Sequence, residues 1–310
     1  MAITEVPLRL GTRGSTLALV QARLVAGELL AEVGLESRID VISTEGDDTA
    51  TSLTSPAAPG VFVSGLRRAL LAGEVDFIVH SCKDLPSGPA AGIELAALLR
   101  RGDHRDVLVS RDRLTLRELA PGAVVGTSSP RRAARMRFLR PDLEVRPIRG
   151  NVDSRLAALR QGSFDALVLA AAGLDRLGRL VEATHYFELD DLVPAPGQGC
   201  LAVECRTGDL FALERVARLD DAETRTCVLA ERAILAALSA SCATAVGAYA
   251  RVADQRLEVV AELSDPNGRR HERFVDSCRL GNDPVRSAVE LGGSIGRRLK
   301  ESDLGRTLAG

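Results

Sequence analysis

Six arginines lie where strands or helices are expected to begin or end, and their chemistry stands out first. They are Arg13, Arg131, Arg132, Arg149, Arg155 and Arg176. Strand C-termini and helix N-termini in open α/β sheets favour anions, because free backbone N–H groups and the helix dipole point there. A guanidinium can also pair with a carboxylate through two hydrogen bonds. The set predicts a binding site for a small substrate rich in carboxylates.

Solubilising charges or surface salt bridges are the simpler explanation for any single one of these arginines. Arg131 and Arg132 fit that explanation less well, because a helix is expected to begin at Pro130 with Ser129 as its cap. A cation in the first turn of a helix opposes the helix dipole. We therefore expect an anion to lie against this pair.

The segment His80–Asp84 follows an apolar strand and places the carboxylate of Asp84 beside the cation Lys83. An ionised carboxylate among many arginines could stabilise a cationic intermediate or transfer a proton. The competing interpretation is that Asp84 caps a helix or orders the loop.

Alternating strands and helices are expected to position these residues. The segment Leu8–Ser15 is typical of a strand that runs into a loop, with Ser15 capping a helix that ends near Gly34. A strand at Ile39–Ser43, a helix at Val63–Ala72 and a strand at Val75–His80 follow. This order favours a mostly parallel sheet with helices on its faces.

The alternation starts again after a break at Arg100–Asp106. Strands are expected at 123–126, 144–148 and 165–170, with a helix at 152–161. A second linker at Leu192–Gly199 precedes one more strand, Cys200–Cys205. Two crossings between two lobes suggest a hinged cleft, as in two-lobed binding proteins.

Beyond Asp220 the pattern becomes α+β. It predicts helices at 223–238 and 283–300, a strand at 246–252, and a hairpin of strands 257–263 and 271–277 around the turn Asp265–Gly268. The predicted fold class is thus α/β: two periplasmic-binding-protein-like lobes around a cleft, plus a smaller α+β C-terminal domain. Residues 1–100 and 200–219 form the first lobe, residues 106–194 the arginine-rich second lobe, and residues 220–310 the C-terminal domain.

Composition limits the partners. The 310 residues include 40 basic and 42 acidic ones, so the chain has no net positive charge that would attract nucleic acid or an anionic membrane. The uncharged run Ile234–Ala250 is short and interrupted by polar residues, so no transmembrane helix is expected. The N-terminus lacks the pattern of a secretory signal, which favours a cytoplasmic protein. The low aromatic content, 3%, favours a monomer over a large interface.

The six cysteines show no C-x-x-C spacing, and the four histidines cluster with none of them. Neither a metal site nor a disulfide framework is expected. Each cysteine is by default a small buried hydrophobic residue.

Seven ordered segments resemble the hydroxymethylbilane synthase family, also called porphobilinogen deaminases, over nearly the whole chain. They are LRLGTRGSTLAL, VHSCKDLP, VGTSSPRR, RPIRGNVDSRL, LVLAAAGLDRLG, PAPGQGCLAVECR and AERAILAALSASCATAVGAYA. The resemblance implies a three-domain transferase that condenses four porphobilinogen molecules head to tail and releases ammonia each time. It also implies a dipyrromethane cofactor joined by a thioether to Cys242, with no metal or nucleotide.

The resemblance assigns roles residue by residue. Asp84 would assist loss of ammonia and stabilise an azafulvene-like cation. The cofactor would be bound by Lys83, Ser129, Arg131, Arg132 and Arg155. The acetate and propionate groups of the substrate would be bound by Arg13, Ser15, Thr127, Arg149, Arg176 and Gln198.

The chain departs from the family pattern in places. Ala240–Ser241 replaces a common glycine pair before Cys242, Ala245 stands where proline is common, and Pro59 and Gly65 replace residues that are often lysine and glutamate. The Cys242 loop is therefore expected to differ in shape from that of other members, and no lid behaviour is predicted for the loop around Pro59 and Gly65.

Alternatives remain for the attachment site and for the function. Cys82 is the rival attachment thiol because Lys83 adjoins it, although methionine is common at that position in the family. A non-catalytic two-lobed receptor for a polycarboxylate and a Schiff-base enzyme using Lys83 are the competing functions.

Overall fold

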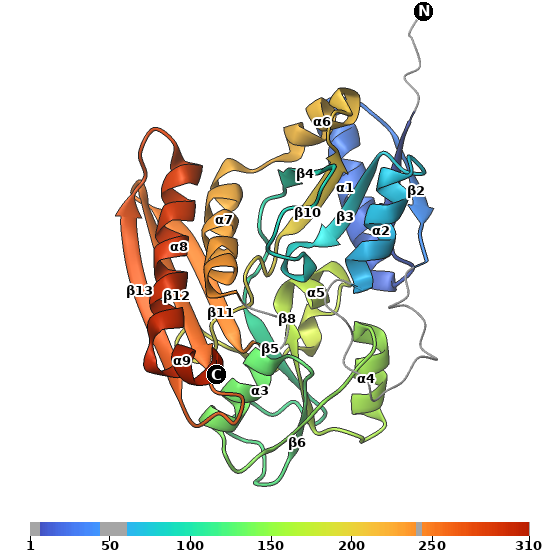
Figure 1. Cartoon of the computed structure of the whole chain (residues 1–310). Coiled ribbons are helices and arrows are strands. Elements are labelled where there is room, and N and C mark those ends of the chain that lie inside the picture. Colours follow the sequence, from blue (N-terminus) through green and yellow to red (C-terminus); the bar gives the residue numbers. More distant parts are fainter. Residues whose placement is uncertain (1–6, 44–60, 240–243, 310) are drawn as a thin grey trace, which may run out of the picture. The chain divides into compact units, whose positions relative to one another are not determined.

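The computed structural model describes residues 7–43, 61–239 and 244–309 (Figure 1). The chain divides into two compact units. Unit 1 comprises Met1–Arg101 and Cys200–Arg225, and unit 2 comprises Gly102–Gly199 and Thr226–Gly310. The chain therefore passes from one unit to the other directly after Arg101, Gly199 and Arg225. The three-domain division expected from the sequence stays a prediction.

Unit 1 contains a five-stranded sheet in the order β2-β1-β3-β10-β4. Strand β1 pairs in parallel with β2 and β3, whereas β10 is antiparallel to both β3 and β4. The strands are β1 (Leu8–Thr12), β2 (Ser37–Val41), β3 (Phe77–Ser81), β4 (Ile93–Leu98) and β10 (Leu201–Arg206).

Helices cover both faces of this sheet. Helices α1 (Thr16–Val33) and α6 (Leu210–Val216) share a core with Phe77 and Val203. Helix α2 (Val61–Leu71) packs Leu66 and Leu70 against Ile78, which is the strand neighbour of Phe77. Because successive strand side chains point to opposite faces, α1 and α2 lie on opposite sides of β3.

The sheet of unit 2 repeats this arrangement, in the order β7-β6-β8-β5-β9. Strand β6 is parallel to β7 and β8, and β5 is antiparallel to β8 and β9. The strands are β5 (Asp106–Ser110), β6 (Val124–Gly126), β7 (Glu144–Arg146), β8 (Ala166–Ala170) and β9 (His185–Tyr186), with helices α3 (Pro130–Leu139), α4 (Val152–Arg160) and α5 (Ala171–Arg176). Met136 of α3 and Leu156 of α4 belong to two separate cores.

Each of the two sheets has an antiparallel strand in its fourth position. Strand β5 in unit 2 follows the crossing after Arg101, and β10 in unit 1 follows the crossing after Gly199. Two α/β sheets of equivalent topology, each including one strand that follows a crossing, confirm the predicted fold class.

The rest of unit 2 is α+β, as predicted. Strands β11 (Val246–Ala253), β12 (Arg256–Ser264) and β13 (His271–Arg279) form an antiparallel sheet. Helices α7 (Ala222–Leu238), α8 (Pro284–Glu301) and α9 (Asp303–Ala309) lie beside it, and α7 belongs to unit 2 from Thr226 onward (Figure 1). Gly292 and Gly296 of α8 face the carbonyls of Ala230 and Ile234, where an added Cβ would clash, so glycine permits close packing of α8 on α7.

The local signals in the sequence were mostly reliable. Ser15 and Ser129 are the predicted N-caps: Ser15 accepts a hydrogen bond from Ala18 N, and Ser129 accepts one from Arg132 N. The turn at Asp265–Gly268 also forms as predicted. The short elements β4, β5, β9, α5, α6 and α9 were missed. Within the described residues, no helix is both long and apolar enough to cross a membrane.

Candidate active site

In unit 1, the predicted catalytic carboxylate lies in a short 3₁₀ turn, η2 (Cys82–Asp84), directly after β3. Leu85 N donates a hydrogen bond to Cys82 O and closes the turn. Cys82 and Leu85 are buried, Lys83 is half-buried and Asp84 is exposed. Two buried side chains thus anchor the turn and leave the Asp84 carboxylate accessible.

A second group of predicted site residues lies at the same edge of this sheet. Arg13 and Ser15 follow β1, which is the parallel neighbour of β3. The amide of Gln21 on α1 donates to the hydroxyl of Ser81 at 3.0 Å. Because parallel strands end at a common edge, the loop with Arg13 and the turn with Asp84 lie side by side. The role of this edge in anion binding stays a prediction.

Behind the Asp84 turn lies a buried ion-pair network that the sequence did not reveal. Arg67 of α2 donates to both carboxylate oxygens of Glu204, at 2.9 and 2.5 Å, and His80 Nε2 lies 3.3 Å from Glu204 Oε2 without hydrogen-bonding geometry. Burial alone would raise the pKa of Glu204, but Arg67 and His80 lower it to about 2. Glu204 is therefore ionised at neutral pH and ties α2 to β10 beneath the end of β3.

Unit 2 contains a buried carboxylate at the centre of three predicted ligand-binding residues. Asp106 is completely buried. Its Oδ2 lies 2.6 Å from Arg131 Nη1, and its Oδ1 lies 2.6 Å from Arg132 Nη2 and 3.1 Å from Gln198 Nε2. Burial alone would raise the pKa of Asp106, but the two arginines outweigh it and hold that pKa well below its ordinary value.

Asp106 supplies the anion expected at the start of α3. Arg131 also donates to Val193 O, and Arg132 donates to Val168 O. Both side chains are buried. Asp106, a residue of the protein itself, thus balances the two cations in the first turn of α3. The additional role of Arg131 and Arg132 as cofactor ligands stays a prediction. Asp106 was missed because the sequence placed it at the end of a linker, not at the start of a buried strand.

A second cationic loop of unit 2 lies between β7 and α4. Arg149 is exposed, and Arg155 Nε donates to Gly150 O at 2.8 Å. Asn151 caps α4 by accepting from Ser154 N, and Gly150 adopts φ +99°. These contacts order the loop around a glycine conformation that other residues rarely adopt.

The loops of unit 2 with predicted site residues meet at one edge. Strand β6 is parallel to both β7 and β8, so the segments that follow all three strands leave from their carboxyl ends. Ser128 donates to Ile148 O at 2.6 Å and joins the first two of these loops. The predicted residues on these segments are Thr127, Ser129, Arg131, Arg132, Arg149, Arg155 and Arg176. The segments that contain the unit 2 arginines therefore all begin at one edge of the sheet.

The linker before Cys200 is held at several points. Arg176 Nη2 donates to Gly199 O at 2.6 Å, and Gln198 Nε2 donates to His104 O at 2.8 Å. The buried carboxylate of Glu231 accepts hydrogen bonds from Gly197 N and Ala250 N. The linker is thus an ordered structure, and Arg176 and Gln198 contribute to that order.

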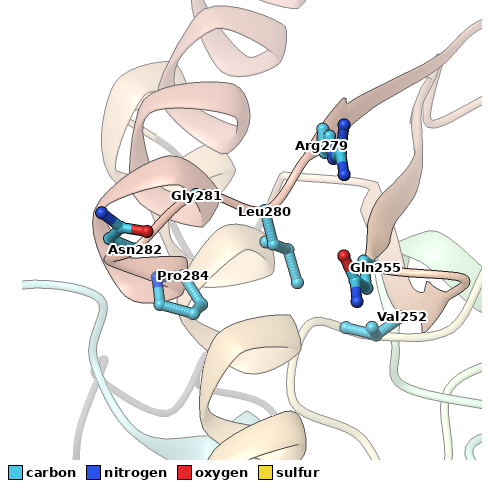
Figure 2. A pocket seen from close by; sticks show the side chains of 7 residues that line it. All are labelled: Val252, Gln255, Arg279, Leu280, Gly281, Asn282 and Pro284. Carbon is cyan, nitrogen blue, oxygen red and sulfur yellow. The ribbon is translucent and has the colours of Figure 1, made fainter.

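Some sequence-based expectations fall outside the described residues. The predicted attachment residue Cys242, the preceding Ala240–Ser241 and Pro59 are among them. A hollow of about 720 Å³ on unit 2 is lined by none of the predicted site residues (Figure 2). Its lining residues are Val252, Gln255, Arg279, Leu280, Gly281, Asn282 and Pro284.

Comparison with known proteins adds independent information. Residues 8–214 match the family model described as "Porphobilinogen deaminase, dipyromethane cofactor binding domain", and residues 225–301 match "Porphobilinogen deaminase, C-terminal domain". A porphobilinogen deaminase of Thermobifida fusca is 48% identical over 299 residues, which cover 96% of this chain and 93% of that protein. One from Mycobacterium tuberculosis is 50% identical over 306 residues, covering 95% and 96% respectively.

Solved structures give more distant similarities. A periplasmic substrate-binding protein of an ABC transporter from Coxiella burnetii aligns with a TM-score of 0.44 and 16% identity, covering 70% of this chain and 93% of that one. An ancestral cationic amino acid solute-binding protein aligns with a TM-score of 0.41 and 16% identity, covering 69% and 87%.

Proposed function

The chain belongs to the porphobilinogen deaminase family, and from this premise we propose how its residues divide the work of the reaction. The protein is a transferase of tetrapyrrole biosynthesis, a hydroxymethylbilane synthase that uses a dipyrromethane cofactor. The observation that supports the assignment best is that both family models match, together spanning most of the chain. Four porphobilinogen molecules are condensed head to tail, with loss of one ammonia at each step.

The residues of this chain fit a cofactor rich in carboxylates. The loop edge of unit 2 presents the exposed Arg149 and the half-buried Arg155 beside the N-terminus of α4, where an anion is favoured. Lys83, Ser129, Arg131, Arg132 and Arg155 would hold the cofactor, and Cys242 would anchor it through a thioether. When bound, the dipyrromethane supplies the terminal pyrrole carbon to which the next substrate unit is joined.

Asp84 is the proposed catalytic residue. Its carboxylate would accept a hydrogen bond from a pyrrole N–H and stabilise the positive charge that develops on the substrate as the amino group departs as ammonia. The turn Cys82–Asp84 suits this role, because buried residues on either side hold it while Asp84 stays exposed. A preorganised charge of this kind needs no rearrangement as the reaction proceeds.

The remaining predicted residues would bind substrate carboxylates. Each porphobilinogen ring has an acetate and a propionate, so a growing product needs several bidentate partners. The proposed set is Arg13, Ser15, Thr127, Arg149, Arg176 and Gln198. The internal contacts of Arg176 and Gln198 with the linker before Cys200 make these two the residues whose substitution would also disturb local structure.

An Asp84→Asn variant tests the catalytic assignment. It keeps the shape of the side chain and removes its charge, so we expect normal folding, a retained cofactor and product formation lowered by about 10²-fold or more. Asp142→Asn, which removes another exposed carboxylate, is the matched control and should keep normal activity. Near-normal formation of hydroxymethylbilane by Asp84→Asn would refute the role.

We also propose that the enzyme works as a cytoplasmic monomer with porphobilinogen as its partner and without nucleic acid. The near balance of basic and acidic residues and the low aromatic content support this proposal. Light scattering should give the mass of a single chain, and a dimer mass would contradict it.

A further inference from the structure

Two cysteines lie opposite each other where β3 ends and β10 begins, beside Asp84. The antiparallel register pairs Leu201 with Ser81, and Cys82 N continues the ladder by donating to Cys200 O at 3.0 Å. Cys82 and Cys200 are therefore directly opposite one another. Both are reduced, buried thiols within unit 1, and each is only 1% exposed.

Side-chain direction also places both thiols on one face of the sheet. Leu201 packs in the core that includes α1, and Ser81 contacts Gln21 of α1. Side chains alternate along an extended strand, and Ser81 has extended backbone angles. The residues that adjoin Leu201 and Ser81, namely Cys200 and Cys82, must then be directed to the opposite face.

The spacing of such a pair is close to that of a disulfide. Directly opposed residues in an antiparallel pair have Cβ atoms about 4.5 to 5.5 Å apart. A disulfide needs Cβ atoms about 3.5 to 4.5 Å apart and Cα atoms within about 6.8 Å. Because Cys82 N donates to Cys200 O, the pair lies at the wider end of the first range, so joining the thiols requires an inward movement of one strand end by about 1 Å and a side-chain rotation.

The other described cysteines lie opposite residues of other types or outside the sheets. Cys205 pairs with Phe77 and Glu94, and Cys278 pairs with Leu257. Cys227 lies on helix α7. Among the residues that the structure describes, the cross-strand cysteine pair is thus specific to Cys82 and Cys200.

We propose that Cys82 and Cys200 form a reversible disulfide that switches the enzyme off. The oxidant is a low-molecular-weight disulfide. One cysteine thiolate attacks it and releases one small thiol, and the second cysteine then attacks the mixed disulfide and releases another. Two protein thiols and one small disulfide thereby yield one protein disulfide and two small thiols. Reduction follows the same steps in reverse.

Oxidation requires local opening, because both thiols are buried. The pair lies just beyond the last residue of β3 and the first residue of β10, where a ladder frays most easily. Cys200 Sγ lies 3.4 Å from Leu99 O and 3.2 Å from Leu201 O, and it must leave these carbonyls to reach Cys82. We therefore expect oxidation to be slow compared with that of an exposed thiol.

The cross-link would act directly on the catalytic turn. Cys82 is the first residue of the turn that ends at Asp84, and Cys200 is the first residue after the chain crosses from unit 2. Drawing the two together displaces the turn, and a shift of about 1 Å in a catalytic group can lower a rate by about 10²-fold. This effect on activity rests on the proposed role of Asp84, whereas formation of the disulfide does not.

The test uses the purified holoenzyme and oxidised glutathione. We expect the wild type to lose the mass of two hydrogen atoms, to yield a linked peptide pair containing Cys82 and Cys200, and to lose about 10²-fold in product formation. Dithiothreitol should restore activity. Cys200→Ser should be active and resistant, whereas Cys205→Ser, altered in the same strand but on the other face, should remain sensitive.

Several results would overturn the proposal. Absence of the linked peptide from the oxidised wild type would refute the disulfide. Equal inactivation of Cys200→Ser, or a linked wild type with full activity, would refute the switch. Failure of the proposed function would be seen separately, because the reduced wild type would then form no hydroxymethylbilane.

Discussion

Replacing the buried carboxylate of Asp106 with an amide should strongly destabilise the sheet of unit 2. In Asp106→Asn, one of the two oxygens that face Arg131 and Arg132 becomes an N–H₂ group, so that donor meets donor. The native ion pairs that this substitution breaks or weakens are short, at 2.6 Å to each arginine. The variant also leaves two buried guanidinium groups without the anion that balances their charge.

The expected size follows from burial. Asp106 is fully buried, and Arg131 and Arg132 are 4% and 7% exposed, so solvent screens the interaction little. Removing one partner of a buried ion pair lowers the free energy of unfolding by about 3 to 5 kcal/mol. Asp142, which pairs with Arg140 at the surface, is the control, and Asp142→Asn should destabilise the protein far less, because solvent screens that pair.

Amide hydrogen exchange is the suitable assay, because a chain of two units does not unfold in a single two-state step. Amides of β5 and β8 should exchange about 10²-fold faster or more in Asp106→Asn, the factor that corresponds to about 3 kcal/mol. Amides of β1 and β3 in unit 1 should change little. An acceleration below about fivefold in β5 would refute the argument that Asp106 stabilises this region through its charge.

Two other substitutions test separate parts of the structure. The folded-state pKa of Glu204 is about 2 against an ordinary 4.5, so its stabilising effect is complete above pH 4.5 and is lost as the pH falls toward 2. Hydrogen exchange of unit 1 amides should show the wild type losing about 3 kcal/mol more local stability than Glu204→Gln across this window, and equal losses would contradict the ionised pair with Arg67. Gly150→Ala should lower the melting temperature and the elongation rate, because the new Cβ would clash with Ser154 Oγ at a φ of +99°. Gly73→Ala, at φ +72° with open space around it, should lower the melting temperature less and leave the elongation rate unchanged.

The sequence predicted those features that depend on neighbours along the chain. The caps Ser15 and Ser129, the turn at Asp265–Gly268 and the location of arginines at strand ends all follow from local propensity and periodicity. These signals also give the order of strands and helices along the chain. The location of Arg149 and Arg155 after the end of a strand of unit 2 could therefore be predicted.

The buried polar partners could not be anticipated in the same way. Asp106 and Arg131 are 25 residues apart, and Glu204 and Arg67 are 137 apart. Pairing between such distant residues is set by how the elements pack, and an apolar strand pattern gives no sign of a charge within it. The same limit applies to Cys82 and Cys200, which become neighbours only through the register of β3 and β10.

The most direct test of the central claim is the intact mass of the purified protein. We predict that the chain exceeds its sequence mass by two linked pyrrole units, that Cys242→Ser lacks this excess, and that Cys82→Ser retains it. An unmodified chain that still converts porphobilinogen to hydroxymethylbilane would contradict the cofactor assignment. An excess that persists in Cys242→Ser would contradict its attachment to that residue.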